Sequence, residues 1–225
     1  MHFAPTPWCI GYNEGMIIID EAFCRQAASY LAQHDAQLAP VIARAGLCKI
    51  VPHQDYYRAL TRSIIGQQLS VKAAASIERQ FRELFGGEFP LPATLLTKTV
   101  EELRPAGLSK QKASYIRDLA QHVVDGKVQF NHLDDMSNGE IIAELTDVKG
   151  VGEWTVHMFL MFCMGRPDVL AHGDLGIRNG IQKLYGLDQP PSPTQVQAIA
   201  KEHHWHPYET VACWYVWYSL DNKPM

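Results

Sequence analysis

Residues 146–154 read T-D-V-K-G-V-G-E-W. Apolar residues at helical spacing precede this stretch and follow it, which predicts one helix over about 139–145 and a second over about 153–164. Gly150 and Gly152 fall between the two helices, where the chain must reverse. The stretch therefore predicts two helices joined by a tight hairpin, and an all-α fold around them.

The hairpin also has the chemistry of an anion site. We expect both glycines to adopt dihedrals closed to other residues while Val151 packs inward. The N–H groups of Gly150, Val151 and Gly152 then lie bare at the start of the second helix, where they fit a DNA phosphate, and Thr155 adds a hydroxyl. Such contacts hold DNA without reading its sequence. The alternative is an ordinary hairpin of two helices with no ligand.

A single acid follows the hairpin in the segment His172 to Arg178, H-G-D-L-G-I-R. Asp174 is placed to cap the next helix, since Gly173-Asp174-Leu175 is what a helix start looks like. Its carboxylate could also do chemistry beside a phosphate held at the hairpin, and the two roles are compatible.

Residues 148–155 followed by Gly173-Asp174-Leu175 resemble the helix-hairpin-helix and Gly/Pro-Asp signature of the DNA base-excision glycosylase superfamily. Trp154 within it resembles the 3-methyladenine DNA glycosylase II branch. The segments 63–70 and 107–115 are similar to that branch as well, so the resemblance extends from about residue 51 to 218. It implies a two-lobed helical fold with the active site in the cleft between the lobes.

The resemblance implies a reaction, the cleavage of a base–sugar bond. Such cleavage builds positive charge on the sugar, which a carboxylate stabilises. One carboxylate is sufficient when the leaving base is already cationic, as an N3- or N7-alkylated purine is. Asp174 is therefore the catalytic candidate.

The resemblance also implies the base pocket. Trp154 occupies the position where bifunctional glycosylase/lyases carry a nucleophilic lysine, which implies a monofunctional enzyme that uses water. Its indole offers a face for a cationic base. Trp217 matches a tryptophan of the pocket wall, although an apolar helix of this kind often buries such a residue in the core. Met158 and Leu175 match pocket positions where some members carry tyrosine.

A base stacked in duplex DNA must be turned out before a pocket can hold it. Gln68 matches the family position that fills the gap, and Ser70 is expected close by in the minor groove. The alternative is a polar turn in which Ser70 caps the following helix, and both can hold. The resemblance further implies a monovalent cation, Na⁺ or K⁺, on the backbone carbonyls of Thr146, Val148 and Val151.

The charge balance gives DNA no general attraction. The 225 residues carry 20 basic and 24 acidic side chains, a formal net charge of −4, so binding depends on a local patch. The candidates for this patch are Arg62, Lys72, Lys110, Lys112, Lys149 and Arg178. A few phosphate contacts predict a shallow dependence of DNA affinity on salt.

Other features bound the function. Five scattered cysteines favour reduced thiols over disulfides, zinc or an iron–sulfur cluster, and no cofactor is required. The run His203, His204, His206 lacks a partner ligand at zinc-like spacing. No export signal or membrane span is evident at the N-terminus, which predicts a soluble protein of the cytoplasm and nucleoid in a bacterium or of the nucleus in a eukaryote. We also expect a monomer.

The remaining helices are predicted over 20–33, 56–65, 70–84, 109–124, 174–184, 194–203 and 207–220. We expect one structural unit. In it, residues 1–50 pack with the C-terminal helices, and 186–225 form those helices. Residues 51–185 carry the hairpin, Asp174 and the turn at 66–70 that holds Gln68, called the wedge turn below. The predicted activity is excision of 3-methyladenine or 7-methylguanine from double-stranded DNA in base excision repair. The alternatives are a bifunctional glycosylase/lyase for oxidised bases and a DNA-binding module without activity.

Overall fold

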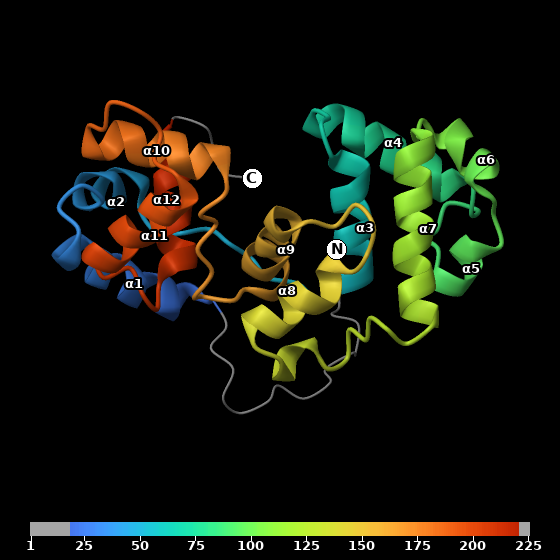
Figure 1. The fold of residues 1–225 in the computed structure, drawn as a ribbon, viewed down its shortest axis with the longest axis horizontal. Helices are drawn as coiled ribbons and strands as arrows, with labels where there is room; N and C mark the ends of the chain where they lie inside the picture. Colours follow the sequence, from blue (N-terminus) through green and yellow to red (C-terminus); the bar gives the residue numbers. More distant parts are fainter. Residues whose placement is uncertain (1–18, 221–225) are drawn as a thin grey trace, which may run out of the picture.

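The computed structural model describes residues 19–220, and every regular element in that range is helical (Figure 1). The prediction of an all-α fold is confirmed. The helices are α1 (Glu21–His34), α2 (Ala39–Ala45), α3 (Tyr56–Gly66), α4 (Val71–Glu83), α5 (Pro92–Leu96), α6 (Val100–Leu103), α7 (Lys110–Val124), α8 (Asn138–Thr146), α9 (Glu153–Phe159), α10 (Leu175–Tyr185), α11 (Pro193–Glu202) and α12 (Glu209–Tyr218). None of the helices in residues 19–220 combines the length and the hydropathy that a membrane span needs.

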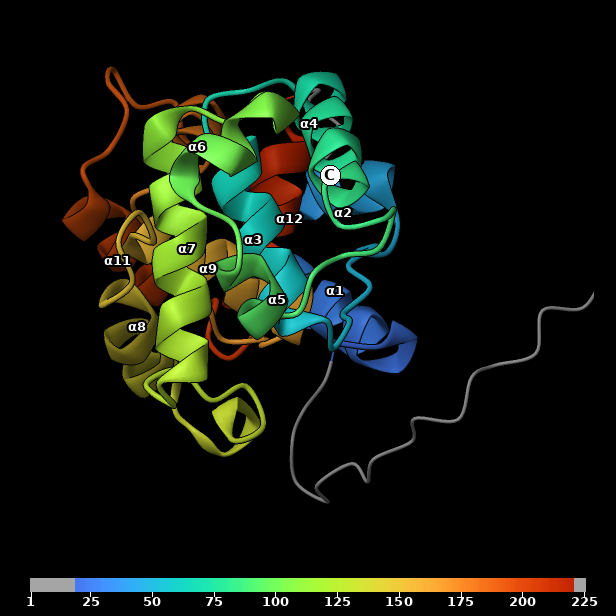
Figure 2. The ribbon, with the colours of Figure 1, turned by 90° about the vertical axis from the view of Figure 1, so that its right-hand side faces the viewer.

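The helices form two groups with the hairpin between them. On one side α12 packs against α1, α2 and α10, and on the other side α7 packs against α3, α5 and α6 (Figures 1 and 2). Helices α8 and α9 lie between the groups and contact each other. The chain passes from the first group to the second after α2 and returns after α9.

The helix α10 packs against α12 and α11, and the boundary expected after residue 185 stays a prediction. Gly180 explains the contact, because a Cβ there would lie 2.5 Å from Cγ1 and 2.9 Å from the carbonyl oxygen of Val216. The missing side chain lets α10 and α12 approach closely. Asp174, which precedes α10, is thereby brought to the same region as α12.

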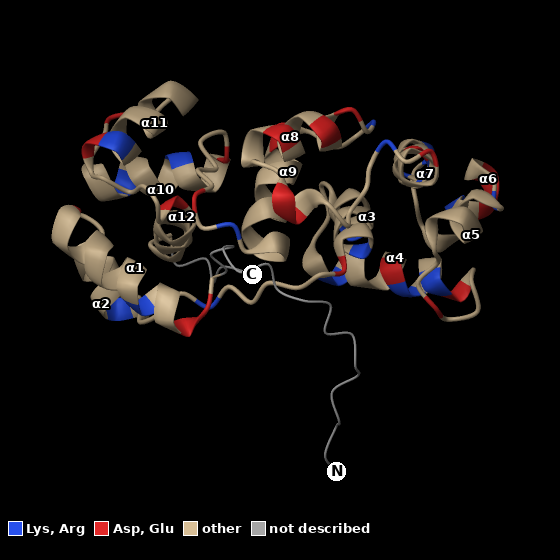
Figure 3. Cartoon of the chain, turned by 90° about the horizontal axis from the view of Figure 1, so that it is seen from below, with Lys and Arg blue, Asp and Glu red and all other residues tan. Residues whose placement is uncertain are grey.

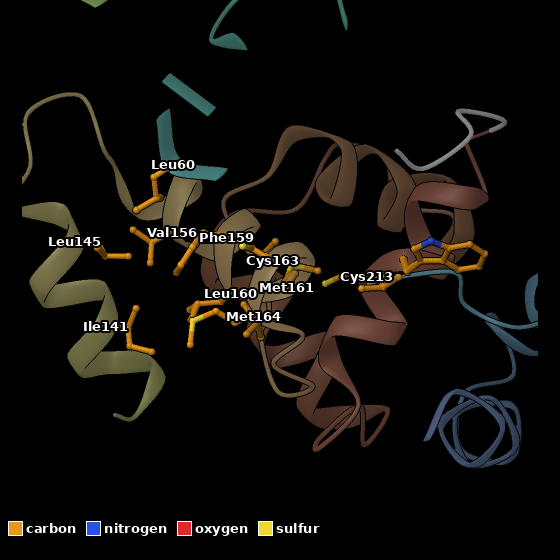
Figure 4. Packing of buried hydrophobic residues seen from close by; sticks show 14 of the residues in the cluster. Leu60, Ile141, Leu145, Val156, Phe159, Leu160, Met161, Cys163, Met164 and Cys213 are labelled. Carbon is orange, nitrogen blue, oxygen red and sulfur yellow. The ribbon is translucent and has the colours of Figure 1, made fainter. Parts of the chain in front are cut away.

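One buried apolar cluster joins the two groups. Its side chains run in a row from Leu60 on α3 through Val156 and Phe159 on α9 to Cys213 on α12 (Figure 4). Full burial of an aliphatic or aromatic side chain of this size stabilises a fold by about 1.5–3 kcal/mol. The position of α9, and with it the hairpin, is therefore fixed from both sides.

The second helix of the hairpin differs from its prediction. It was expected to be one helix to about Met164, but the α-helical part ends at Phe159 and residues Leu160–Met164 continue as a π-helix. Such segments are rare and are often found near functional sites. Gly165, with φ of +70°, ends the segment in the left-handed conformation.

Candidate active site

Gly150 forms the turn of the hairpin and cannot be replaced without a clash. Its φ is +84°, and a Cβ on it would lie 2.1 Å from Cδ2 of Tyr115 on α7. The ring of Tyr115 therefore packs directly on the turn. Val151 is buried, as predicted.

Gly152 departs from its prediction. Its φ of −99° and ψ of 170° are extended values open to any residue, and a Cβ there would meet nothing within 4 Å. The expectation of special dihedrals was right for Gly150 and wrong for Gly152. The reason is that Gly152 is the N-cap of α9, and this helix start has no side-chain cap. Its first N–H groups remain open to an anion.

Two other predictions concern groups around the hairpin. Thr155 is only 4% exposed, because α9 packs it into the interior, and the structure gives no support to a contact between its hydroxyl and a phosphate. Of the carbonyls expected to bind a monovalent cation, that of Val148 accepts a hydrogen bond from the N–H of Val151 at 3.0 Å. A carbonyl has a second lone pair, so the ligand set of Thr146, Val148 and Val151 stays a prediction.

The wedge turn, residues 66–70, is tied to the hairpin. Nε2 of Gln67 donates to the carbonyl of Gly150 at 2.8 Å. Nζ of Lys112 donates to the carbonyls of Ile65 and Gln67 at 2.8 and 2.6 Å. These bonds hold the turn from beneath and leave the side chain of Gln68 exposed at its tip.

The backbone of the wedge turn is unusual at Gln68. Its φ is +59°, a conformation uncommon for a residue with a side chain. Ser70 caps α4, since its hydroxyl accepts from the N–H of Ala73 at 3.3 Å. The capping alternative for Ser70 therefore holds. Both Gln68 and Ser70 are exposed, which keeps them available for DNA.

Asp174 is fixed by three N–H donors. Its Oδ1 accepts from the backbone N–H of Ile177 at 2.8 Å, which caps α10. The same oxygen accepts from the indole N–H of Trp217 on α12 at 2.8 Å, and Oδ2 accepts from the indole N–H of Trp154 on α9 at 2.7 Å. Both tryptophans predicted for the pocket thus meet on the predicted catalytic carboxylate.

Further side chains surround these two indoles. Trp154 is 47% exposed, while Trp217 is half-buried and lies against Phe162 of the π-helix, with ring centroids 5.7 Å apart and a tilt of 32°. Met158 is half-buried one turn after Trp154 on the same face of α9. Leu175, directly after Asp174, is 63% exposed. Phe162 was not predicted, because its contact depends on where α12 lies.

Comparison with known proteins agrees with this geometry. Residues 61–204 match the family described as HhH-GPD superfamily base excision DNA repair protein. The chain belongs to the HhH-GPD superfamily. It is 35% identical over 163 residues to DNA-3-methyladenine glycosylase 1 of Schizosaccharomyces pombe, which covers 72% of this chain and 71% of that protein.

Solved structures place the chain in the 3-methyladenine glycosylase branch of the HhH-GPD superfamily. A DNA-3-methyladenine glycosidase from Bacillus halodurans superimposes with a TM-score of 0.78 at 36% identity, over 87% of this chain and 89% of that one. The Schizosaccharomyces pombe 3-methyladenine DNA glycosylase, solved in complex with abasic DNA, gives a TM-score of 0.75 at 30% identity, over 85% and 95% of the two chains.

The basic patch expected of an HhH-GPD protein on DNA is modest here. Lysines and arginines are interspersed with acidic residues along the helices (Figure 3). Nζ of Lys149 lies 3.4 Å from Asp118, and Nε of Arg62 lies 2.9 Å from Glu78. These contacts were not visible in the sequence, because Asp118 lies on α7 and Glu78 on α4, far along the chain from their partners.

Proposed function

We propose that this protein excises alkylated purines from double-stranded DNA by hydrolysing the N-glycosidic bond, and that Asp174 is the carboxylate that stabilises the reacting sugar. The observation that carries this is the convergence of Trp154 and Trp217 on the two oxygens of Asp174. Two indoles that would hold a base are thereby fixed beside the anion that would face its sugar.

The steps follow from the positions of these groups. The open N–H groups at the start of α9 would bind a phosphate beside the lesion, and Gln68 would fill the space left when the damaged base turns out. The exposed face of Trp154 would then stack on the cationic base. The sequence offers tryptophan, not lysine, at this place, so water is the nucleophile and the abasic strand stays intact.

The energetic role of Asp174 is electrostatic. As the bond between base and sugar breaks, its electrons leave with the base and positive charge develops on the deoxyribose. A carboxylate about 4 Å from that charge contributes roughly 4 kcal/mol at an effective dielectric constant near 20, before desolvation is counted. At ~1.4 kcal/mol for each factor of ten, this corresponds to about a thousand-fold in rate.

The test is the variant Asp174→Asn. Asparagine keeps the shape and caps a helix about as well as aspartate, so α10 and the fold should persist. We expect excision of 7-methylguanine from methylated duplex DNA, measured by chromatography of the free base, to fall about a thousand-fold while DNA binding is retained. Unchanged excision would show that another group acts on the sugar. Trapping of a covalent DNA adduct by borohydride would indicate lyase chemistry instead.

A further inference from the structure

Three side chains next to the proposed active site form a cluster that the proposed base excision does not use. Glu153 begins α9, His157 lies one turn later, and His172 lies on the segment that returns to α10. Oε1 of Glu153 is 3.7 Å from Nε2 of His157 and 3.6 Å from Nε2 of His172. One potential ligand atom from each residue lies within 4.8 Å of the other two.

These distances are close to those of a zinc site. Zinc binds imidazole nitrogen at about 2.0–2.1 Å and carboxylate oxygen at about 2.0–2.2 Å, so neighbouring ligand atoms of a tetrahedral ion are roughly 3.3–3.4 Å apart. The two separations from Glu153 exceed this by a few tenths of an ångström, which rotation of its exposed side chain can close. The two imidazole nitrogens lie within 4.8 Å of each other, so they approach further when an ion binds. Two histidines and one carboxylate are also a common ligand set for zinc.

The surroundings fix the histidines and leave one side open. The side chains of His157 and His172 are 9% and 21% exposed, and their rings meet edge to face with centroids 5.4 Å apart. The side chain of Glu153 is 55% exposed, so water can reach the fourth position. The two rings are therefore held in place before an ion arrives, which lowers the entropy lost on binding.

An ordinary ion pair leaves polar groups of this cluster unsatisfied. A single carboxylate oxygen faces both imidazoles. At 3.7 and 3.6 Å, neither imidazole Nε2 is hydrogen-bonded to that oxygen. Nε2 of His172 faces Glu153, and its Nδ1 is buried without a hydrogen-bond partner, so no protein acceptor orders this ring. A cation between the three side chains would accept the Nε2 lone pairs of both imidazoles.

We propose that Glu153, His157 and His172 bind one Zn²⁺ ion, with water as the fourth ligand. The ion joins the first turn of α9 to the segment before α10. Trp154 directly follows Glu153, and Asp174 comes two residues after His172. Zinc would thus fix the spacing between the two elements that carry the indole and the carboxylate. The ligand set stands on its own geometry and does not depend on the reaction proposed for Asp174.

The test uses untagged full-length protein freed of metal by chelation. Titration with Co²⁺, followed by its visible absorption, reports the number of sites and their tetrahedral geometry, and competition with Zn²⁺ gives the affinity. We expect one site per chain. His157→Gln and His172→Gln should each weaken zinc binding by more than the ~10–100-fold that loss of an outer hydrogen-bond partner costs. Zinc should raise the melting temperature of the wild type and not of these variants.

Matched controls separate this site from other ligands. His34→Gln changes an exposed histidine at the end of α1, and Cys9→Ser removes the thiol outside the described residues. Both should bind Co²⁺ like the wild type, and circular dichroism should show that the metal-free variants are folded. The proposal is overturned if the wild type binds no Co²⁺, or if either ligand variant binds it as the wild type does.

Discussion

Gly176 lies between the two side chains that define the proposed site. A Cβ on it would be 2.9 Å from Oδ1 of Asp174 and 2.9 Å from Cδ1 and Nε1 of Trp217. We expect Gly176→Ala to push the indole or the carboxylate aside and to lower excision by up to about a hundred-fold, since small misplacements of catalytic groups cost that much. Single-turnover release of 7-methylguanine measures the effect.

The matched control for this substitution is Gly139→Ala. Gly139 lies in the first turn of α8, where a Cβ would meet nothing within 4 Å. Alanine should there leave excision unchanged and raise the free energy of unfolding by about 0.5–1 kcal/mol, the usual gain for this change in a helix. If Gly176→Ala and Gly139→Ala lose activity to the same extent, the loss does not come from a clash with Trp217.

For single residues, the sequence predicts which side chains take part in the chemistry better than it predicts which side chains touch. Asp174 and the tryptophans were predictable, because a lone acid and an indole stand at marked positions of a known motif. The roles of Gly176 and Phe162 were not, since each depends on a tryptophan from α12 that sequence spacing cannot place. Glu153 and His157 are four residues apart on one helix face, which was a visible signal, but His172 joins them only through the fold.

Among the elements, the wedge turn depends most on a single side chain. Lys112 donates from α7 to the carbonyls of Ile65 and Gln67, and partial burial lowers its pKa. Lys112→Met would leave both carbonyls without this donor and free the turn that presents Gln68. We expect excision from duplex DNA to fall about ten-fold, equivalent to ~1.4 kcal/mol. Lys201→Met, an exposed change on α11, should have no effect, and equal loss in both would contradict the role.

The start of α12 predicts a pH dependence of stability. Burial raises the pKa of Glu209 above its ordinary value of 4.5, and its Oε2 is buried without a partner. A raised pKa means that the folded state holds the proton more tightly than the unfolded state, so stability is lost as the pH rises through the raised value. We expect the melting temperature of Glu209→Gln to exceed that of the wild type at pH 7. Below pH 4.5 the two melting temperatures should be equal.

The control for Glu209 is Glu202→Gln, which changes an exposed carboxylate at the end of α11. Its melting temperature should follow that of the wild type at every pH. A difference between Glu209→Gln and the wild type that does not grow with pH would show that packing, and not charge burial, is responsible.

Among the elements, a helix could be predicted from the sequence where neighbouring residues determine where it begins. Ser137 and Glu140 form the capping box that begins α8, and its helical spacing was visible in the sequence. The change from α-helix to π-helix after Phe159 has no such signal in the sequence. The ring of Tyr115 on Gly150 likewise depends on how α7 meets the hairpin.

For the whole molecule, the net charge predicts weak electrostatic attraction to DNA. In the structure, contacts within the protein reduce the number of cations that are free to bind phosphate. Four of the six cations expected to form the basic patch make contacts within the protein. They are Arg62 with Glu78, Lys149 with Asp118, Lys112 with two backbone carbonyls, and Arg178 with the carbonyl of Pro191. Lys72 and Lys110 remain exposed at the first turns of α4 and α7.

Two free cations predict a specific salt dependence. Each phosphate that a cation neutralises contributes roughly −0.9 to the slope of log affinity against log salt, so we expect a slope of about −2. Fluorescence anisotropy of Asp174→Asn on a labelled duplex, over a series of potassium chloride concentrations, measures it. Lys72→Gln should make the slope shallower by about one, and Lys201→Gln, on a helix away from the hairpin, should not. A slope steeper than about −4 would mean that the ion-paired cations leave their partners to bind DNA.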